Sequence, residues 1–294
     1  MKAAAFAYHR PDAVEEAVDL LAEYGDEAKI LAGGQSLVPM LAMRLTHFDN
    51  LIDISRIEEL VGIDLRDGEI RIGAATPHAF VGMDDEVADS VPLLTLATPY
   101  IGHFQIRTRG TLGGAIAHAD PAAEYAAVAL ALDARMEAVS PRGSRDIPAG
   151  EFFTGLWDNS MATDEILTAV HFPVWGARSG FAVEEFARRH GDFAIAGAAV
   201  AVELDDESRV SRCGIGLLGL GSTPLRGSAA EEAVLGRLVG DVTAAEIGQL
   251  AIGGLDDIPA DLQGSAAYRA RVGATMVARA WESATSQVTG ARNE

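Results

Sequence analysis

The spacing of apolar residues predicts alternating helix and strand at the start of the chain. After Pro11, apolar residues recur every three to four positions up to Leu21, which predicts an amphipathic helix. Asp12 and Glu15 have the spacing of a capping box at the start of this helix, and Gly25 ends it. The unit continues with a strand at 28–32, a short helix from Pro39 and a strand at 51–54, and its core closes at about residue 57.

From residue 58 the pattern changes to a period of two, which is typical of half-buried strands. Asp67-Gly68 lies between two alternating runs and predicts a tight hairpin. The expected elements are a hairpin at 63–72, helices beginning at Thr76-Pro77 and at Pro92, an alanine-rich helix at 122–132, a hairpin at 136–147 and a strand at 166–172 that Pro173 ends.

Residues 173–180 combine proline, glycine and serine and have the composition of a linker. Beyond it, three strands precede three helices, an order that indicates an α+β domain. We therefore expect an α+β protein divided into 1–57, 58–177 and 178–286, with a tail at 287–294. The expected strands are 181–186, 198–204 and 210–217, and the expected helices are 228–238, 243–253 and 265–285.

The composition and charge of the chain mainly exclude certain partners and cofactors. The net charge of −20 repels nucleic acid and anionic lipid. No stretch reaches the length of a membrane span, and the amino terminus lacks the apolar run of a signal peptide, so we expect a cytoplasmic protein. The single cysteine, Cys213, excludes an iron–sulfur cluster ligated by this chain alone, so redox chemistry here requires an organic cofactor. We interpret three acidic runs, at 84–86, 205–207 and 256–257, as solvated loops.

Two glycine-rich segments, 33–36 and 110–114, are the strongest chemical signal. Each combines paired glycines with a hydroxyl residue, Ser36 or Thr111, and we interpret each as following an apolar strand. Paired glycines let backbone N–H groups converge on an anion. Alone, such a segment is more often a tight turn. Together, the two segments predict one pyrophosphate held from two sides.

Other motifs carry less information. Residues 214–219 match the G-x-G-x-x-G dinucleotide fingerprint, but Gly-Ser-Thr-Pro follows at 221–224, so no helix opens at the third glycine and we interpret the segment as a packed strand. The seven histidines show no metal-ligand spacing, and only His118 lies near a candidate site. Ser36 is not in a nucleophile elbow, so nucleophilic hydrolysis has little support.

Several ordered motifs together carry a family resemblance. They are 32–41 (AGGQSLVPML), 101–107 (IGHFQIR), 109–114 (RGTLGG), 118–124 (HADPAAE), 188–194 (RRHGDFA) and 219–226 (GLGSTPLR). The chain resembles, over essentially its whole length, the FAD-binding medium subunit of molybdenum hydroxylases, a family that includes xanthine dehydrogenase. The aerobic carbon monoxide dehydrogenase type is the most similar.

The resemblance implies an α+β architecture with a two-subdomain FAD-binding fold, of the PCMH or vanillyl-alcohol-oxidase-like type, followed by an α+β carboxy-terminal domain. It implies that 32–36 and 111–115 hold the FAD pyrophosphate and ribityl chain through backbone amides and hydroxyls. Asp120 and Glu124 are then expected along the ribityl and flavin side, and Phe193 over a ring face. The cofactor-binding residues implied are Ala32, Gly33, Gly34, Gln35, Ser36, Leu37, Ile101, Thr111, Leu112, Gly113, Gly114, Ala115, His118, Asp120, Glu124, Ile166, Leu167, Asp192 and Phe193.

Two positions depart from the family's pattern. Ala115 stands where asparagine is frequent, which removes one side-chain hydrogen bond to the cofactor unless backbone amides suffice. Gln35 stands where histidine or threonine is frequent, and it keeps both a donor and an acceptor. FAD binding therefore remains the expectation.

The resemblance further implies a division of labour between subunits. Substrate is oxidised at a molybdopterin cofactor in a large subunit, [2Fe-2S] clusters of a small subunit pass the electrons on, and the FAD of this chain delivers them to an external acceptor. This chain then needs no catalytic acid or base and no metal. We expect a dimer of heterotrimers in the cytoplasm, with no nucleic-acid partner and no membrane span. Peripheral contact with a membrane through the acceptor stays open.

The substrate expected first from the resemblance is carbon monoxide. An N-heterocycle or aldehyde hydroxylase is the main alternative. A noncatalytic protein that binds FAD or another nucleotide during assembly, and a stand-alone flavin reductase that uses a nicotinamide, are the alternatives from other functional classes.

Overall fold

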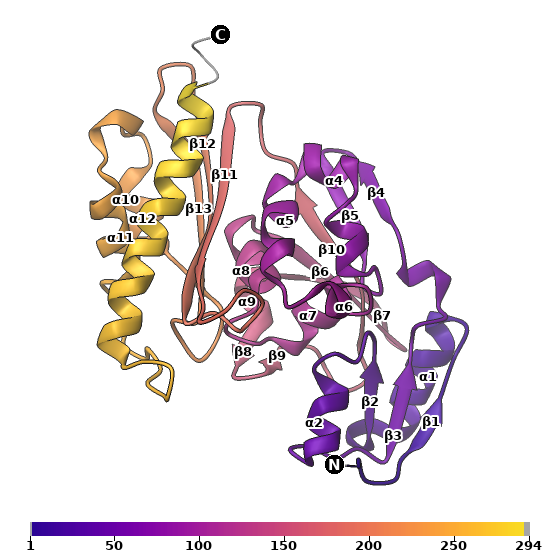
Figure 1. Cartoon of the computed structure of the whole chain (residues 1–294). Helices are drawn as coiled ribbons and strands as arrows, with labels where there is room; N and C mark the ends of the chain where they lie inside the picture. Colours follow the sequence, from indigo (N-terminus) through magenta and orange to yellow (C-terminus); the bar gives the residue numbers. More distant parts are fainter. Residues whose placement is uncertain (1, 291–294) are drawn as a thin grey trace.

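The computed structural model describes residues 2–290 and shows three sheets in succession along the chain (Figure 1). The first sheet has the parallel strand order β1-β3-β2, and helix α1 packs on it through buried residues that include Val14, Val18 and Leu21. This unit is the predicted small αβ unit, with β1 as an additional strand. Its elements are β1 (Ala7–His9), α1 (Val14–Tyr24), β2 (Ala28–Leu31), α2 (Leu37–Met43) and β3 (Asn50–Asp53).

The second sheet is antiparallel in the order β4-β5-β10-β6-β7, and both predicted hairpins are confirmed within it. Asp67 and Gly68 both have positive φ, as a tight two-residue hairpin turn requires. The strands are β4 (Ile63–Arg66), β5 (Glu69–Gly73), β6 (Arg135–Ser140), β7 (Gly143–Pro148) and β10 (Ile166–Pro173), and a small hairpin pairs β8 (Phe153–Gly155) with β9 (Asp158–Asn159). The helices are α3 (His78–Val81), α4 (Asp85–Ser90), α5 (Pro92–Ala97), α6 (Phe104–Arg107), α7 (Leu112–His118), α8 (Glu124–Ala131) and α9 (Ala149–Phe152).

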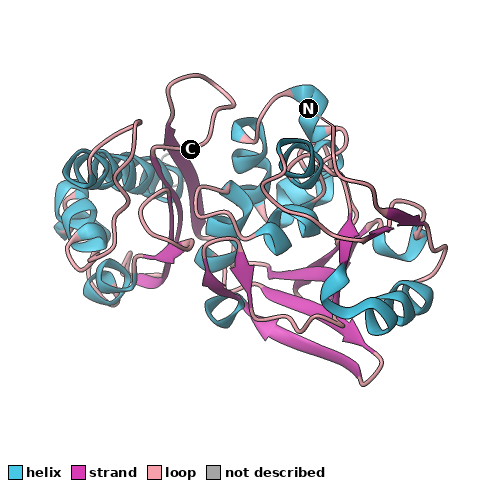
Figure 2. Ribbon diagram, turned by 90° about the horizontal axis from the view of Figure 1, so that it is seen from below, coloured by secondary structure: helices cyan, strands magenta, loops and turns pink. Residues whose placement is uncertain are grey.

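The third sheet, β11-β12-β13-β14, is antiparallel and carries helices on both of its faces, as Figure 2 shows. Strands come first and helices after, as predicted. The strands are β11 (Ser179–Phe186), β12 (Ala196–Leu204), β13 (Val210–Leu218) and β14 (Leu225–Arg226), and the helices are α10 (Ser228–Val234), α11 (Ala244–Ile252) and α12 (Ala266–Gly290). Helix α12 extends to Gly290, beyond the predicted end at 285 and into the predicted tail at 287–294, of which 291–294 lie outside the described residues.

Helix α8 joins the second and third sheets because its backbone packs directly on β13. A Cβ atom at Gly214 would overlap the carbonyl oxygen of Ala131, and one at Gly216 would overlap that of Ala127. The intervening Ile215 points to the other side of the sheet, into the core beneath α11 and α12. The G-x-G-x-x-G segment is thus part of a packed strand, as predicted, and its first two glycines let the backbone of α8 lie directly against the sheet.

An ion network lies at the end of this contact. Asp133, just after α8, pairs with Arg212 of β13 and with Arg226 of β14. Arg226 also pairs with Glu231, whose Oε1 accepts the Ile215 N–H at 2.7 Å. Partly exposed ion pairs contribute about 0–1 kcal/mol each, so the close backbone packing is the larger constraint.

Helices begin within a few residues of the positions predicted after Pro11 and at Thr76-Pro77, but the local contacts at three helix starts differ from expectation because other partners occupy the groups concerned. The capping box does not form: α1 begins at Val14, whose N–H donates to Oε1 of Glu59 at 2.8 Å. Thr76 does not cap α3, because its hydroxyl bonds to the backbone of Gly62. The acidic run at 84–86 begins a helix instead of a loop, since Asp84 accepts the Val87 N–H as the N-cap of α4.

The α8–β13 contact makes a stability prediction. We expect Gly216→Ala to destabilise the protein by about 1–3 kcal/mol, since the new methyl group must push α8 away from the sheet. Urea unfolding measures the change. Gly254→Ala is the matched control because a Cβ at Gly254 meets no atom within 4 Å. Equal stability of the two variants would contradict the prediction.

Candidate functional site: a cavity between the three units

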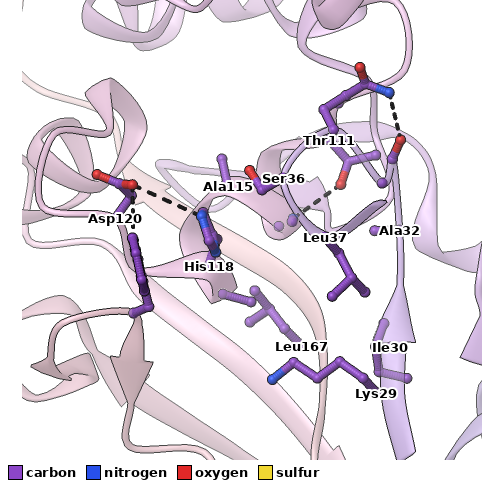
Figure 3. Close-up of a pocket in the computed structure, with 18 of the residues that line it drawn as sticks. Lys29, Ile30, Ala32, Ser36, Leu37, Thr111, Ala115, His118, Asp120 and Leu167 are labelled. Atoms are coloured by element: carbon purple, nitrogen blue, oxygen red, sulfur yellow. Dashed lines mark hydrogen bonds and ion pairs between the residues drawn. The ribbon is translucent and has the colours of Figure 1, made fainter. Parts of the chain in front are cut away.

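One cavity of about 670 Å³ lies where the three units meet. The loop after β2, helix α7, the start of β10 and the loop at 191–193 between β11 and β12 all contribute to its wall. Figure 3 shows Ser36 and Thr111 in its upper part, Lys29 and Leu167 in its lower part, and Asp120 at one side. This volume is within the range of sites that enclose a large organic ligand.

The first glycine loop presents unused hydrogen-bond donors. Within residues 2–290, no acceptor is found for the N–H groups of Gly34, Gln35 and Ser36, and the Ser36 hydroxyl has no partner. Gly34 has φ +71°, which favours glycine, and the Gln35 side chain bonds back to the Gly33 carbonyl at 3.0 Å. N–H groups and a hydroxyl that have no protein partner can donate hydrogen bonds to an oxygen-rich anion.

The second glycine loop differs from expectation in two ways. It follows the short helix α6 instead of a strand. Its N–H groups are also already occupied, with Leu112 and Gly113 donating to the carbonyls of Thr76 and Ala74, and Gly114 donating to Thr111 Oγ1 at 3.0 Å. The N–H groups of this loop are therefore not available to a ligand. The loop instead forms part of the cavity wall and contributes the Thr111 hydroxyl.

His78 braces the second loop and was not found from the sequence. Its ring is 4% exposed, and Nε2 lies 2.8 Å from the Thr111 carbonyl oxygen. Burial lowers the pKa of His78 to about 4, so the neutral ring donates its Nε2–H to that carbonyl. The ring also packs edge-on against Tyr125, with centroids 5.2 Å apart.

A close contact fixes the two loops to each other. A Cβ at Gly33 would overlap the carbonyl oxygen of Arg109, so the first loop can lie against the second only with glycine at this position. The first loop and α7 are therefore held together as parts of one cavity wall.

Two carboxyl groups lie together where α8 meets the third sheet. Glu124 begins α8 and lines the cavity, and Glu185 on β11 has a buried oxygen, Oε2, with no partner among the described residues. Burial raises the pKa of Glu124 to about 7 and that of Glu185 to about 8. Asp120 adds to the shift of Glu124, and Glu124 to that of Glu185, because each neighbour is also an acid.

The structure brings the predicted cofactor-binding residues together around this cavity, with Leu112 as the exception. Leu112 is fully buried in the core, so its side chain does not reach the cavity. Lys29 is the one lysine or arginine in the cavity wall within residues 2–290. Sequence patterns missed Lys29, His78 and Trp157, since only the tertiary structure brings them to the wall.

Residues 2–290 contain no cluster of three or more His, Cys, Asp or Glu side chains placed to hold a metal ion. No helix in that part of the chain has the length and apolar character needed to cross a membrane.

Comparison with known proteins identifies both halves of the chain. Residues 4–175 match the FAD binding domain in molybdopterin dehydrogenase, and residues 181–284 match the CO dehydrogenase flavoprotein C-terminal domain. The 6-hydroxypseudooxynicotine dehydrogenase complex subunit alpha of Paenarthrobacter nicotinovorans is 44% identical, with 95% of this chain and 94% of that protein covered.

Two further similarities extend this result. The caffeine dehydrogenase subunit beta of Pseudomonas sp. strain CBB1 is 37% identical, with 98% of this chain and 97% of that protein covered. A chain of the carbon monoxide dehydrogenase of Hydrogenophaga pseudoflava, solved without the Mo-pyranopterin moiety of its molybdenum cofactor, superposes with a TM-score of 0.92 at 37% identity, covering 97% and 98% of the two chains.

The buried carboxyl pair predicts a pH dependence of stability. The folded chain keeps protons on Glu124 and Glu185 that the unfolded chain releases near the ordinary pKa of 4.5, so stability falls as pH rises from about 4.5 to about 8. We expect Glu185→Gln to flatten this fall in urea unfolding across that range. Glu184→Gln, at the adjacent position of β11, is the control; an equal effect of both variants would contradict the assignment.

Proposed function

The chain belongs to the family of FAD-binding medium subunits of molybdenum hydroxylases and resembles the medium subunit of carbon monoxide dehydrogenase, and we propose that its FAD lies in the cavity between the three units. We propose further that this FAD passes electrons to an external acceptor. The observation that carries this proposal is the set of unpartnered donors at Gly34, Gln35 and Ser36, which lie in the wall of a cavity of suitable volume that α7 also lines.

The residues present suit a dinucleotide. The first loop offers N–H groups and a hydroxyl for the diphosphate, and the Thr111 hydroxyl lies in the facing wall. Lys29 supplies the one full positive charge, which matters in a chain of net charge −20. Apolar Ile166 and Leu167, together with the exposed ring of Phe193, supply surfaces for the ring systems.

We assign the cofactor contacts by this geometry. The first loop and Thr111 bind the diphosphate, and Asp120 and Glu124 lie along one side of the bound molecule. The flavin supplies the redox chemistry, and the chain orients it, shields it and sets its electrostatic surroundings. The proposed contacts are those of Ala32, Gly33, Gly34, Gln35, Ser36, Leu37, Ile101, Thr111, Gly113, Gly114, Ala115, His118, Asp120, Glu124, Ile166, Leu167, Asp192 and Phe193.

The partners follow from the same family. We propose that a large subunit carries the molybdopterin cofactor and that a small subunit carries [2Fe-2S] clusters, which donate electrons to the FAD. The lone, buried Cys213 supports this division, because a single cysteine cannot ligate a [2Fe-2S] cluster. We further propose a cytoplasmic dimer of heterotrimers and the domain divisions 1–57, 58–177 and 178–286.

Cofactor content tests the proposed site. The purified complex is expected to show flavin absorbance that substrate bleaches, and to release FAD on denaturation. Gly33→Val is expected to reduce FAD occupancy at least about tenfold, since the side chain forces the two glycine loops apart. Gly254→Val is the control, because it enters open space. Full occupancy in Gly33→Val would contradict the site, and flavin that substrate does not bleach would favour a noncatalytic nucleotide-binding protein.

The substrate of the large subunit has two candidates. Carbon monoxide is supported by the match to the CO dehydrogenase flavoprotein C-terminal domain and by the superposition on carbon monoxide dehydrogenase. An N-heterocyclic compound is supported by 44% identity to a subunit named for 6-hydroxypseudooxynicotine and 37% identity to one named for caffeine.

Anaerobic reduction distinguishes these substrates. Oxidation of carbon monoxide with water to carbon dioxide, and hydroxylation of a ring C–H bond with water, each release two electrons and two protons. We expect one of the two compounds to bleach the flavin of the complex with two electrons per FAD. Bleaching by a pyridine or purine substrate but not by carbon monoxide would exclude the carbon monoxide assignment, and the reverse result would exclude the heterocycle.

A further inference from the structure

Trp157 stands out from the other tryptophans of the chain. Its side chain is 51% exposed, whereas Trp175 and Trp281 are 7% and 2% exposed. It lies in the tight turn between β8 and β9 and lines the cavity. Its φ of +56° is in the left-handed region, which is strained for a non-glycine residue and is retained mainly where surrounding structure or function requires it.

The Trp157 indole is held in one orientation by its neighbours. Its Nε1–H donates to Oδ2 of Asp120 at 3.0 Å, and the other oxygen of Asp120 accepts the Ala122 N–H at 2.9 Å. The His118 ring is parallel to the indole, with an interplanar angle of 9° and centroids 6.2 Å apart. Asn159 donates to the Ala117 carbonyl at 2.8 Å and so attaches the hairpin to α7.

These contacts fix an aromatic plane at one side of the cavity before any ligand arrives. Fixing a large ring in advance removes the entropy that a mobile side chain would lose on binding. Asp120 also leaves lone pairs for a ligand, since a carboxylate accepts about four hydrogen bonds and two donors bond to it here. His118 Nε2 lies 4.0 Å from Oδ2, beyond hydrogen-bond distance, and adds an ion-pair contact on the same side (Figure 3).

We propose that Trp157, His118 and Asp120 form a subsite that binds a planar heteroaromatic ring of the cofactor, with the ring packed on the aromatic pair and an N–H group donated to Asp120. This inference rests on the proposed FAD site and adds a ring-binding surface to it. Adenine and isoalloxazine share the required chemistry, a flat ring with an N–H donor at its edge.

Tryptophan emission of the full chain, freed of FAD, tests the subsite. ADP and riboflavin are the two probes, because each carries one of the rings alone. ADP does not absorb tryptophan emission, so a change of emission that is present in the wild type and absent from Trp157→Phe places adenine on Trp157. If riboflavin binds more weakly to Trp157→Ala than to the wild type and ADP does not, the isoalloxazine ring lies there.

Affinity supplies a second, independent readout. We expect Trp157→Ala to weaken FAD binding about tenfold and Trp157→Phe by only about two- to threefold, because phenylalanine keeps a ring but loses the N–H. Leu156→Ala is the matched control: Leu156 is the preceding residue of the same turn, is 58% exposed and does not line the cavity. Its FAD affinity is expected to equal that of the wild type.

The outcomes separate this inference from the proposed function. A wild-type chain that binds no FAD, alone or with its partner subunits, overturns both. A wild type that binds FAD, with Trp157→Ala binding FAD and riboflavin as tightly as the wild type and with Trp157 emission unchanged by ADP, overturns the ring subsite and leaves the FAD site intact. The ADP emission readout needs only the wild type and Trp157→Phe, and the riboflavin affinities of the same two chains are compared as well, so the test holds even if Trp157→Ala fails to fold.

Discussion

The close packing of helix α8 on strand β13 is the constraint on which the rest of the structure depends. Without side chains at Gly214 and Gly216, the helix backbone comes within contact distance of the sheet, and the carboxy-terminal unit docks at one fixed position. That position brings the loop between β11 and β12 back to the first two units. Gly191 in this loop then lies against the carbonyl of Gly102, beside the cavity. The cavity is therefore complete only when all three units are assembled.

Within the cavity, the two glycine loops have different tasks although they look alike in the sequence. The first loop has N–H groups with no partner in the described structure. The second loop donates its own N–H groups to the backbone carbonyls of Ala74 and Thr76. For the proposed diphosphate of the cofactor, this strongly acidic protein thus offers local backbone dipoles and one lysine on one side of the cavity and a rigid wall on the other. Rigidity on one side and free donors on the other give a preorganised site.

Local patterns predicted most of the fold but only part of the site. The hairpins around Asp67-Gly68 and the strand character of 214–219 followed from short-range geometry, and the structure confirms them. The features that the sequence did not predict depend on contacts between residues far apart in the chain. Thr76 bonds Gly62 instead of capping a helix, and His78 reaches the Thr111 carbonyl 33 residues away. The periodicity of apolar residues predicts helices and strands but does not predict which distant groups hydrogen-bond to each other.

Helix α8 touches two environments at once, and this has a thermodynamic consequence. Its first residue, Glu124, lies in the cavity wall, and the rest of the helix is buried between the second and third sheets. Linkage through such a helix is reciprocal: a ligand in the cavity that changes the affinity of the carboxy-terminal sheet for a partner has its own affinity changed by that partner by the same factor.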